Sequence, residues 1–179
     1  MQYIIEILRK EGCSLVVKNH GIVTTYSKPG VRDLEHLLDH EPDVLKGATI
    51  ADKVIGKAAA AMVVVGGVRE LYAEVMSKRA IPFLDNAGIA YSYGTLVDTI
   101  KEEGDRCKLE KITAPATTPE ETVALLRAHF EEKRREKLEI RRYRIENRKV
   151  RNIFISEKLW LIKPRIKFRV WLEIILRLR

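Results

Sequence analysis

The sequence lacks the features that mark a secreted, metal-stabilised or membrane-spanning protein. It contains two cysteines, Cys13 and Cys107, in 179 residues, which is too few for a disulfide scaffold or a zinc ribbon. No window of eighteen apolar residues is free of charge, so we expect no transmembrane helix. Charges at Glu6 and Arg9–Glu11 interrupt the first apolar run and argue against a signal peptide. We therefore expect the protein to be located in the reducing environment of the cytoplasm.

An excess of positive charge is also missing from most of the chain. The whole chain has a formal net charge of +8, but residues 130–179 hold 17 of the 33 Lys and Arg and 7 of the 25 Asp and Glu. Their net charge is +10, so that of residues 1–129 is −2. We predict a domain over residues 1–130 and a basic C-terminal extension over 131–179, helical at first and then irregular or disordered.

The first third of the chain predicts a helix, a hairpin and a second helix. Residues 2–10 favour a short helix. Two strands are expected over 13–18 and 22–26, joined by Asn19-His20-Gly21, in which Asn and Gly would supply the positive φ angles of a tight turn. Residues 31–40 have the spacing of an amphipathic helix.

The rest of the domain alternates between helices and strands. Thr49 with Asp52 is typical of a helix N-terminus, and the predicted helix runs to Val65, before Gly66-Gly67. The elements expected next are a strand over 68–76, a helix over 77–86 capped by Ser77, a strand over 89–93, helical turns over 95–102 and a helix from Thr118. Crossovers imply parallel pairing and the hairpin is antiparallel, so the fold class is α/β, a three-layer α/β/α sandwich with a mixed sheet.

The string Asp-Lys-x-x-Gly-Lys-Ala-Ala-Ala at Asp52–Ala60 is the most specific motif. With supporting segments, it resembles an uncharacterised prokaryotic family of unknown function in the cytidine deaminase-like superfamily, over residues 13–128. The resemblance implies a deaminase-like fold and makes Tyr93 and Glu110 candidate pocket residues. The supporting segments are Ser27–Val31 with Leu34 and Leu37-Leu38, Ala87–Ile89 with Ser92-Tyr93, and Cys107 with Leu109-Glu110.

The zinc ligands of a deaminase have no counterpart at the expected helix starts. Such enzymes hold zinc with a His or Cys at one helix start and two Cys at the next. The corresponding segments here, 51–53 and 77–80, contain neither residue type. His36 and His40 are four residues apart, but no third ligand is evident, so we interpret them as part of a polar helix surface. We expect no metal, no cofactor and no zinc-dependent deamination.

Lys53 and Lys57 lie four residues apart at the start of the predicted helix and suggest an anion site. Gly56 would allow a ligand to approach the backbone closely, and Asp52 and Ser77 would lie at neighbouring helix starts. The alternatives are two solvated lysines, a glycine selected for packing on the sheet, and an aspartate that only caps the helix. The predicted ligand-binding residues are Asp52, Lys53, Gly56, Lys57, Ser77, Tyr93 and Glu110.

Catalysis is the weaker interpretation of the same residues. Cys107 and Asp52 are candidate catalytic groups, because a thiolate near lysines is activated. No histidine is paired with Cys107 in the sequence, and a lone loop cysteine is more often inert. The first hypothesis is a binding domain for a nucleotide or another small anion, and the second is an enzyme of unestablished reaction in the same pocket.

A third hypothesis is an interaction protein that acts through residues 131–179. Basic and large apolar residues are mixed from Val150 onward, and both tryptophans lie there. This composition is compatible with a nucleic-acid backbone, an anionic membrane surface or an extension without a partner. Residues 166–170 alternate like a strand, and 171–178 could form a helix. Homo-oligomerisation is a further expectation.

Overall fold

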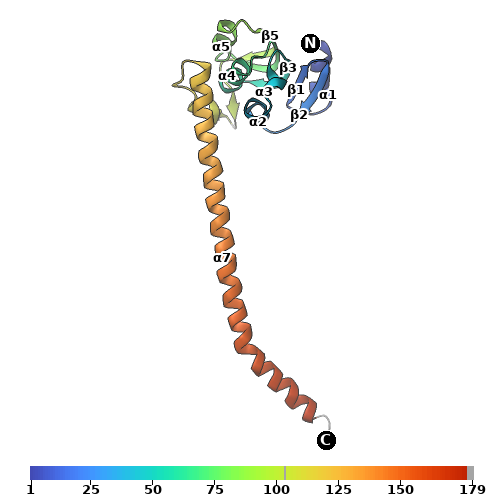
Figure 1. The fold of residues 1–179 in the computed structure, drawn as a ribbon, viewed down its shortest axis with the longest axis vertical. Helices are drawn as coiled ribbons and strands as arrows, with labels where there is room; N and C mark the ends of the chain where they lie inside the picture. Colours follow the sequence, from blue (N-terminus) through green and yellow to red (C-terminus); the bar gives the residue numbers. More distant parts are fainter. Residues whose placement is uncertain (103, 177–179) are drawn as a thin grey trace. The chain divides into compact units, whose positions relative to one another are not determined.

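A computed structural model describes the backbone of residues 1–102 and 104–176 (Figure 1). Side chains are described for residues 1–101, 104, 105 and 107–148. The chain divides into two units, residues 1–129 and residues from 130 onward. All strands of the described chain belong to the first unit, and the second continues one helix.

A mixed five-stranded sheet forms the centre of the first unit. The strand order is β2-β1-β3-β4-β5, and a separate pair is formed by β6 (Lys101–Glu102) and β7 (Asp105–Arg106). β1 pairs antiparallel with β2 and β3, whereas β3, β4 and β5 are parallel, so the predicted mixed α/β sheet is confirmed. The main strands are β1 (Leu15–Asn19), β2 (Ile22–Tyr26), β3 (Thr49–Ile55), β4 (Glu70–Ser77) and β5 (Ala90–Val97).

Helices cover the sheet on both faces. On one face, α1 (Gln2–Lys10) packs Ile4 and Leu8 against Val16 and Tyr72. The connections that link β3 to β4 and β4 to β5 lie on the other face, as right-handed crossovers require (Figure 1). This arrangement is the predicted three-layer sandwich. The helices of the second layer are α2 (Arg32–His40), α3 (Pro42–Leu45), α4 (Lys57–Val65), α5 (Ile81–Asn86) and α6 (Lys108–Ile112).

The first hairpin was predicted correctly in position but not in its turn chemistry. His20 and Gly21 have φ angles of 47° and 81°, so His20 takes the left-handed position that was assigned to Asn19. Asn19 instead donates hydrogen bonds from Nδ2 to the carbonyls of Asp43, Val44 and Lys46, at 3.0–3.2 Å. Its side chain therefore ties β1 to α3.

The predicted helix start at Asp52 is wrong. Residues Thr49–Ile55 form the central strand β3, and α4 begins at Lys57. Four of these seven residues are β-branched and favour a buried strand, while the unbroken run of alanines begins only at Ala58. The same correction applies to Ser77, which ends β4, and to residues 95–97, which extend β5 instead of forming helical turns.

Helix α7 (Pro119–Leu176) begins as predicted. The Thr118 hydroxyl accepts the Glu121 N–H at 3.1 Å, and the Glu121 carboxylate accepts the Thr117 N–H at 2.8 Å. The helix includes residues 166–170, so the strand suggested there is wrong. Side chains from 149 onward, and residues 177–179, lie outside the described part, as do the predictions made for them. None of the described helices combines the length and the apolar composition needed to cross a membrane.

Candidate functional site

A cavity of about 370 Å³ opens at the carboxyl end of strand β3. Its walls come from the residue before β1, the turn before α2, the end of β3, the first turn of α4 and the segment 100–110. Ligands of open α/β sheets commonly bind beyond the carboxyl ends of parallel strands. The polar side chains in the lining are those of Ser14, Asp52, Lys53, Lys101, Cys107 and Glu110.

Five of the residues selected from the sequence line this cavity, and three do not. Residues 52 and 53 lie on β3 and residue 56 precedes α4, whereas residues 107 and 110 are more than fifty positions away in the chain. The two groups meet because α6 packs against α4. The lining members are Asp52, Lys53, Gly56, Cys107 and Glu110; Lys57, Ser77 and Tyr93 lie outside it.

Asp52 holds a local turn inside the sheet. Its Oδ1 accepts the N–H of Val54 at 2.8 Å, as an aspartate does in an Asx-turn. Strand pairing is interrupted at the next position, where Lys53, Glu74 and Gly94 fall between the paired residues of β3, β4 and β5. The Asp52 carboxylate therefore belongs to the cavity wall at the end of a strand, and it does not lie at a helix N-terminus.

Burial raises the pKa of Asp52 to about 7. The negative charge of Asp33 acts in the same direction, while the backbone N–H groups of Val54 and Lys53 lower the pKa and limit the shift. Asp33 is itself buried and accepts the Lys28 N–H at 2.8 Å. Asp52 is therefore close to half-protonated at neutral pH.

Glu110 is the more deeply buried carboxylate, with 2% of its surface exposed. It accepts the Ile100 N–H at 3.3 Å on Oε1 and a short hydrogen bond from the Thr99 hydroxyl on Oε2. A Cβ atom on Gly56 would lie 3.2 Å from both Oε1 of Glu110 and Cγ1 of Ile100. The absence of a side chain at Gly56 therefore makes room for Glu110 and Ile100 in the cavity wall, and close approach of a ligand to its backbone stays a prediction.

The two lysines of the motif have different roles. Lys53 is exposed and donates one hydrogen bond from Nζ, to the Gly12 carbonyl at 3.3 Å. Lys57 turns away from the cavity and donates from Nζ to the carbonyls of Thr113 and Ala116, both at 2.7 Å. Burial, followed by the Arg79 charge, lowers the pKa of Lys57. Lys57 thus fastens the end of α6 to α4, and the predicted pair of lysines on one helical face is wrong.

Of the remaining predicted residues, Ser77 and Tyr93 lie apart from the cavity lining and Cys107 belongs to it. The buried Ser77 hydroxyl accepts the Arg79 N–H at 3.2 Å and stabilises the turn into α5. Tyr93 is 43% exposed on the edge strand β5. Cys107 is half-buried in the lining and precedes α6, and its N–H donates to the Ile100 carbonyl at 2.9 Å. Only the cysteine of these three is placed to meet a ligand in the cavity.

Sequence reasoning missed Ser14 and Lys101 in the lining, and Gly94 in the adjoining sheet. A Cβ atom on Gly94 would lie 2.9 Å from the Glu74 carbonyl oxygen, so glycine is required where the strand pairing is interrupted. Ser14 is held by hydrogen bonds to the carbonyls of Tyr26 and Lys28, at 3.2 and 3.1 Å. None of these positions belongs to a local motif, because their neighbours come from distant parts of the chain.

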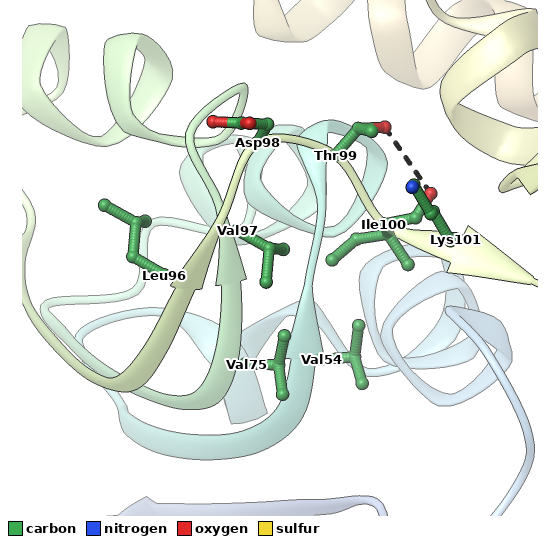
Figure 2. A pocket seen from close by; sticks show the side chains of 8 residues that line it. All are labelled: Val54, Val75, Leu96, Val97, Asp98, Thr99, Ile100 and Lys101. Carbon is green, nitrogen blue, oxygen red and sulfur yellow. Dashed lines mark hydrogen bonds between the residues drawn. The ribbon is translucent and has the colours of Figure 1, made fainter.

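A second, wider hollow of about 640 Å³ adjoins the first (Figure 2). It lies over the ends of β3, β4 and β5, and Val54, Ile100 and Lys101 line both spaces. Its floor is aliphatic. The cavity therefore borders an aliphatic surface on one side.

Sequence comparison places this architecture in a known family. The family described as "Domain of unknown function (DUF1893)" matches residues 3–130. The chain belongs to this family. No curated protein is significantly similar to it in sequence.

Solved structures support the same fold. A DUF1893 family protein from Thermotoga maritima superimposes with a TM-score of 0.66 and 23% sequence identity, covering 72% of this chain and 88% of its own. A diaminohydroxyphosphoribosylaminopyrimidine deaminase/5-amino-6-(5-phosphoribosylamino)uracil reductase from the same organism gives a TM-score of 0.34 and 18% identity, covering 52% of this chain and 35% of its own. The first match shows the fold, and the second carries no argument about function.

Cysteine and histidine ligands for a metal are absent from the starts of α4 and α5 in this DUF1893 domain. The first is Gly56-Lys57 and the second Ala80-Ile81, and neither contains a Cys or His. His36 and His40 stack with ring centroids 4.8 Å apart on α2, and His36 contacts the Glu41 carboxylate at 3.4 Å. Among the residues whose side chains are described, no group of three or more His, Cys, Asp or Glu could hold a metal ion.

Proposed function

We propose that residues 1–129 form a binding domain that holds a small anionic molecule, a nucleotide first among the candidates, in the cavity at the end of β3. The observation that carries the proposal is the convergence of Asp52, Lys53, Lys101 and Glu110 on one cavity from separate segments of the chain. A concave site of this size with a few polar groups in an otherwise apolar lining is typical of small-molecule binding.

The charges in the lining suggest how such a ligand would be oriented. Lys53 and Lys101 are exposed, so their ammonium groups can meet a phosphate or carboxylate at the entrance. Glu110 is buried and accepts hydrogen bonds, as does the ionised form of Asp52. A ligand with N–H groups at one end and an anionic group at the other would satisfy both sets.

We also propose that the domain has a cytidine deaminase-like topology without the chemistry of zinc deaminases. The parallel β3-α4-β4-α5-β5 unit supports the topology. Zinc deaminases need His or Cys ligands at the helix starts that correspond to α4 and α5. Gly56-Lys57 and Ala80-Ile81 supply none, and so the residues present do not fit that metal.

The proposed binding function is tested by ligand-induced stabilisation of the full-length protein. Inorganic phosphate and a panel of nucleoside monophosphates should raise the melting temperature of the wild type. Lys53→Ala and Lys101→Ala should reduce this shift. Lys18→Ala is the matched control, because Lys18 is exposed on β1 outside the lining. If no anion stabilises the protein, or if all three variants respond equally, the proposal fails.

One observation favours a second candidate, an enzyme that transfers protons in the same cavity. Asp52 has a pKa of about 7 and shares the lining with Cys107, and general acid–base groups work best near that pKa. Turnover of a nucleotide that is lost in Asp52→Asn or Cys107→Ala, with binding retained, would support the enzyme. Binding without turnover supports the binding domain.

Residues 131–179 carry a separate proposal, which is contact with a polyanionic surface. Its support is the net charge of +10 in residues 130–179. Replacement of Arg141, Arg142 and Arg144 by Glu in the full chain should weaken binding to RNA or to anionic vesicles, and the salt dependence should fall with it. Unchanged binding would leave the basic segment without this role. Homo-oligomerisation also remains a proposal, which sedimentation velocity tests.

A further inference from the structure

The hollow beside the β3 cavity exposes aliphatic side chains where a sheet normally buries them. Val54 is 42% exposed and pairs in register with Val75, which is partly exposed as well. Figure 2 shows Val54, Val75, Val97 and Ile100 grouped around one space, whereas Leu96 and Asp98 point away from it. Covering apolar surface of this kind with another apolar group lowers the free energy, because both groups are removed from water.

The hollow and the cavity adjoin each other and share three lining residues. Val54 forms a wall of both, and so do Ile100 and Lys101 at their boundary. A molecule anchored in the β3 cavity would therefore meet aliphatic surface as soon as it extended past Lys101. The ammonium group at this boundary complements an anionic group on the molecule.

We infer that the ligand of this site is amphipathic, with its anionic group beside Lys53 and Lys101 and an aliphatic chain laid over Val54, Val75 and Val97. The inference rests on the proposed function of the β3 cavity and specifies the class of ligand. A small molecule accounts for the hollow better than a docked protein does, because the aliphatic surface directly adjoins the β3 cavity.

The inference is tested with a homologous series of alkyl phosphates, from methyl to octyl phosphate, titrated into the full-length protein by calorimetry. Each methylene that leaves water should increase the affinity about fourfold until the hollow is filled. A nucleoside monophosphate measured in parallel shows whether an aromatic base can take the place of the alkyl chain.

Two kinds of variant separate the head group from the chain. Val75→Asn, at a position that lines the hollow but not the cavity, should abolish the dependence on chain length and leave methyl phosphate binding unchanged, while the near-isosteric Val54→Thr should weaken octyl phosphate several-fold. Lys53→Ala should weaken every member of the series by the same factor. Val65→Thr is the matched control, because Val65 is 38% exposed on α4 and lines neither space.

The outcomes distinguish this inference from the proposed function. If short phosphates bind but longer ones bind no better, the amphipathic ligand is excluded and the anion site stands. The inference is also overturned if chain-length dependence survives in both the Val75→Asn and the Val54→Thr variants. If no phosphate of any length binds, the proposed function fails first.

Discussion

The end of strand β3 and the first turn of helix α4 carry polar residues with opposite effects on the fold. At the end of β3, the Asp52 carboxyl is partly buried and has a raised pKa, and the Lys53 side chain makes a single hydrogen bond of 3.3 Å. At the start of α4, Lys57 is held by carbonyl groups at 2.7 Å, and its ammonium lies 5.7 Å from the centre of the Phe83 ring. The Lys53 side chain therefore forms few hydrogen bonds within the protein, whereas the hydrogen-bonding capacity of Lys57 is used within the protein.

This difference indicates which region is available to a ligand. A buried carboxylate with a raised pKa costs stability at neutral pH, and a protein keeps such a group where function requires it more often than where packing does. The side chain of Lys57 would have to abandon the carbonyls of Thr113 and Ala116 before it could bind an anion.

Asp52→Asn should have the largest effect, and the effect should depend on pH. The folded-state pKa of Asp52 is about 7, against 3.8 for an unperturbed aspartate. The folded state therefore binds the proton more tightly than the unfolded state, and stability present below pH 4 is lost as the pH rises to about 7. The asparagine variant should be about 2–4 kcal/mol more stable than the wild type at pH 8, with little difference at pH 4.

Urea denaturation of both proteins across pH 4–8 measures this difference. Asp43→Asn, at an exposed position on α3, serves as the control and should show no such trend. A pH-independent difference at Asp52 would mean that its carboxyl does not carry the stability cost assigned to it.

Lys57→Met should lower the free energy of unfolding by about 2 kcal/mol, because it leaves the carbonyls of Thr113 and Ala116 without their donor. Lys53→Met should change it by no more than about 0.5 kcal/mol, as expected for an exposed side chain. The two variants have the same chemistry four residues apart, so each is the control for the other. Equal effects would remove the contrast between the two regions.

Gly56→Ala should have a smaller effect on stability than Lys57→Met, a loss of about 1 kcal/mol. The new methyl group would press on Oε1 of Glu110 and Cγ1 of Ile100, each 3.2 Å from its position. The loss should be accompanied by weaker anion binding, because the same atoms border the cavity. Thermal unfolding with and without phosphate measures both quantities, and unchanged binding would separate Gly56 from the site.

The sequence was sufficient for the elements whose signals are local. The capping residues Thr118 and Glu121 defined the start of α7, and the alternation of helices and strands predicted the α/β sandwich. It was insufficient where tertiary context decides. Thr49 and Asp52 have the spacing of a capping pair, but the sheet requires a central strand there, and Asp52 satisfies a backbone N–H two residues on instead.

The candidate site shows the same division. Asp52, Lys53, Gly56, Cys107 and Glu110 were identified from the motif and the resemblance, and the fold brings them together. Lys57 was misplaced because one helix was assumed where a strand and a helix meet. Lys101 and Ser14 were missed because their role depends on contacts with segments distant in sequence.

Binding of an anionic ligand in the cavity at the end of β3 can be tested by following amide chemical shifts during a phosphate or nucleoside monophosphate titration. We expect saturable shifts at Ser14, Asp52–Gly56, Lys101 and Cys107–Glu110, with little change for the amides around Tyr93 on the edge strand. Saturable shifts confined to other residues, or no saturable shifts with any anion tested, would contradict it.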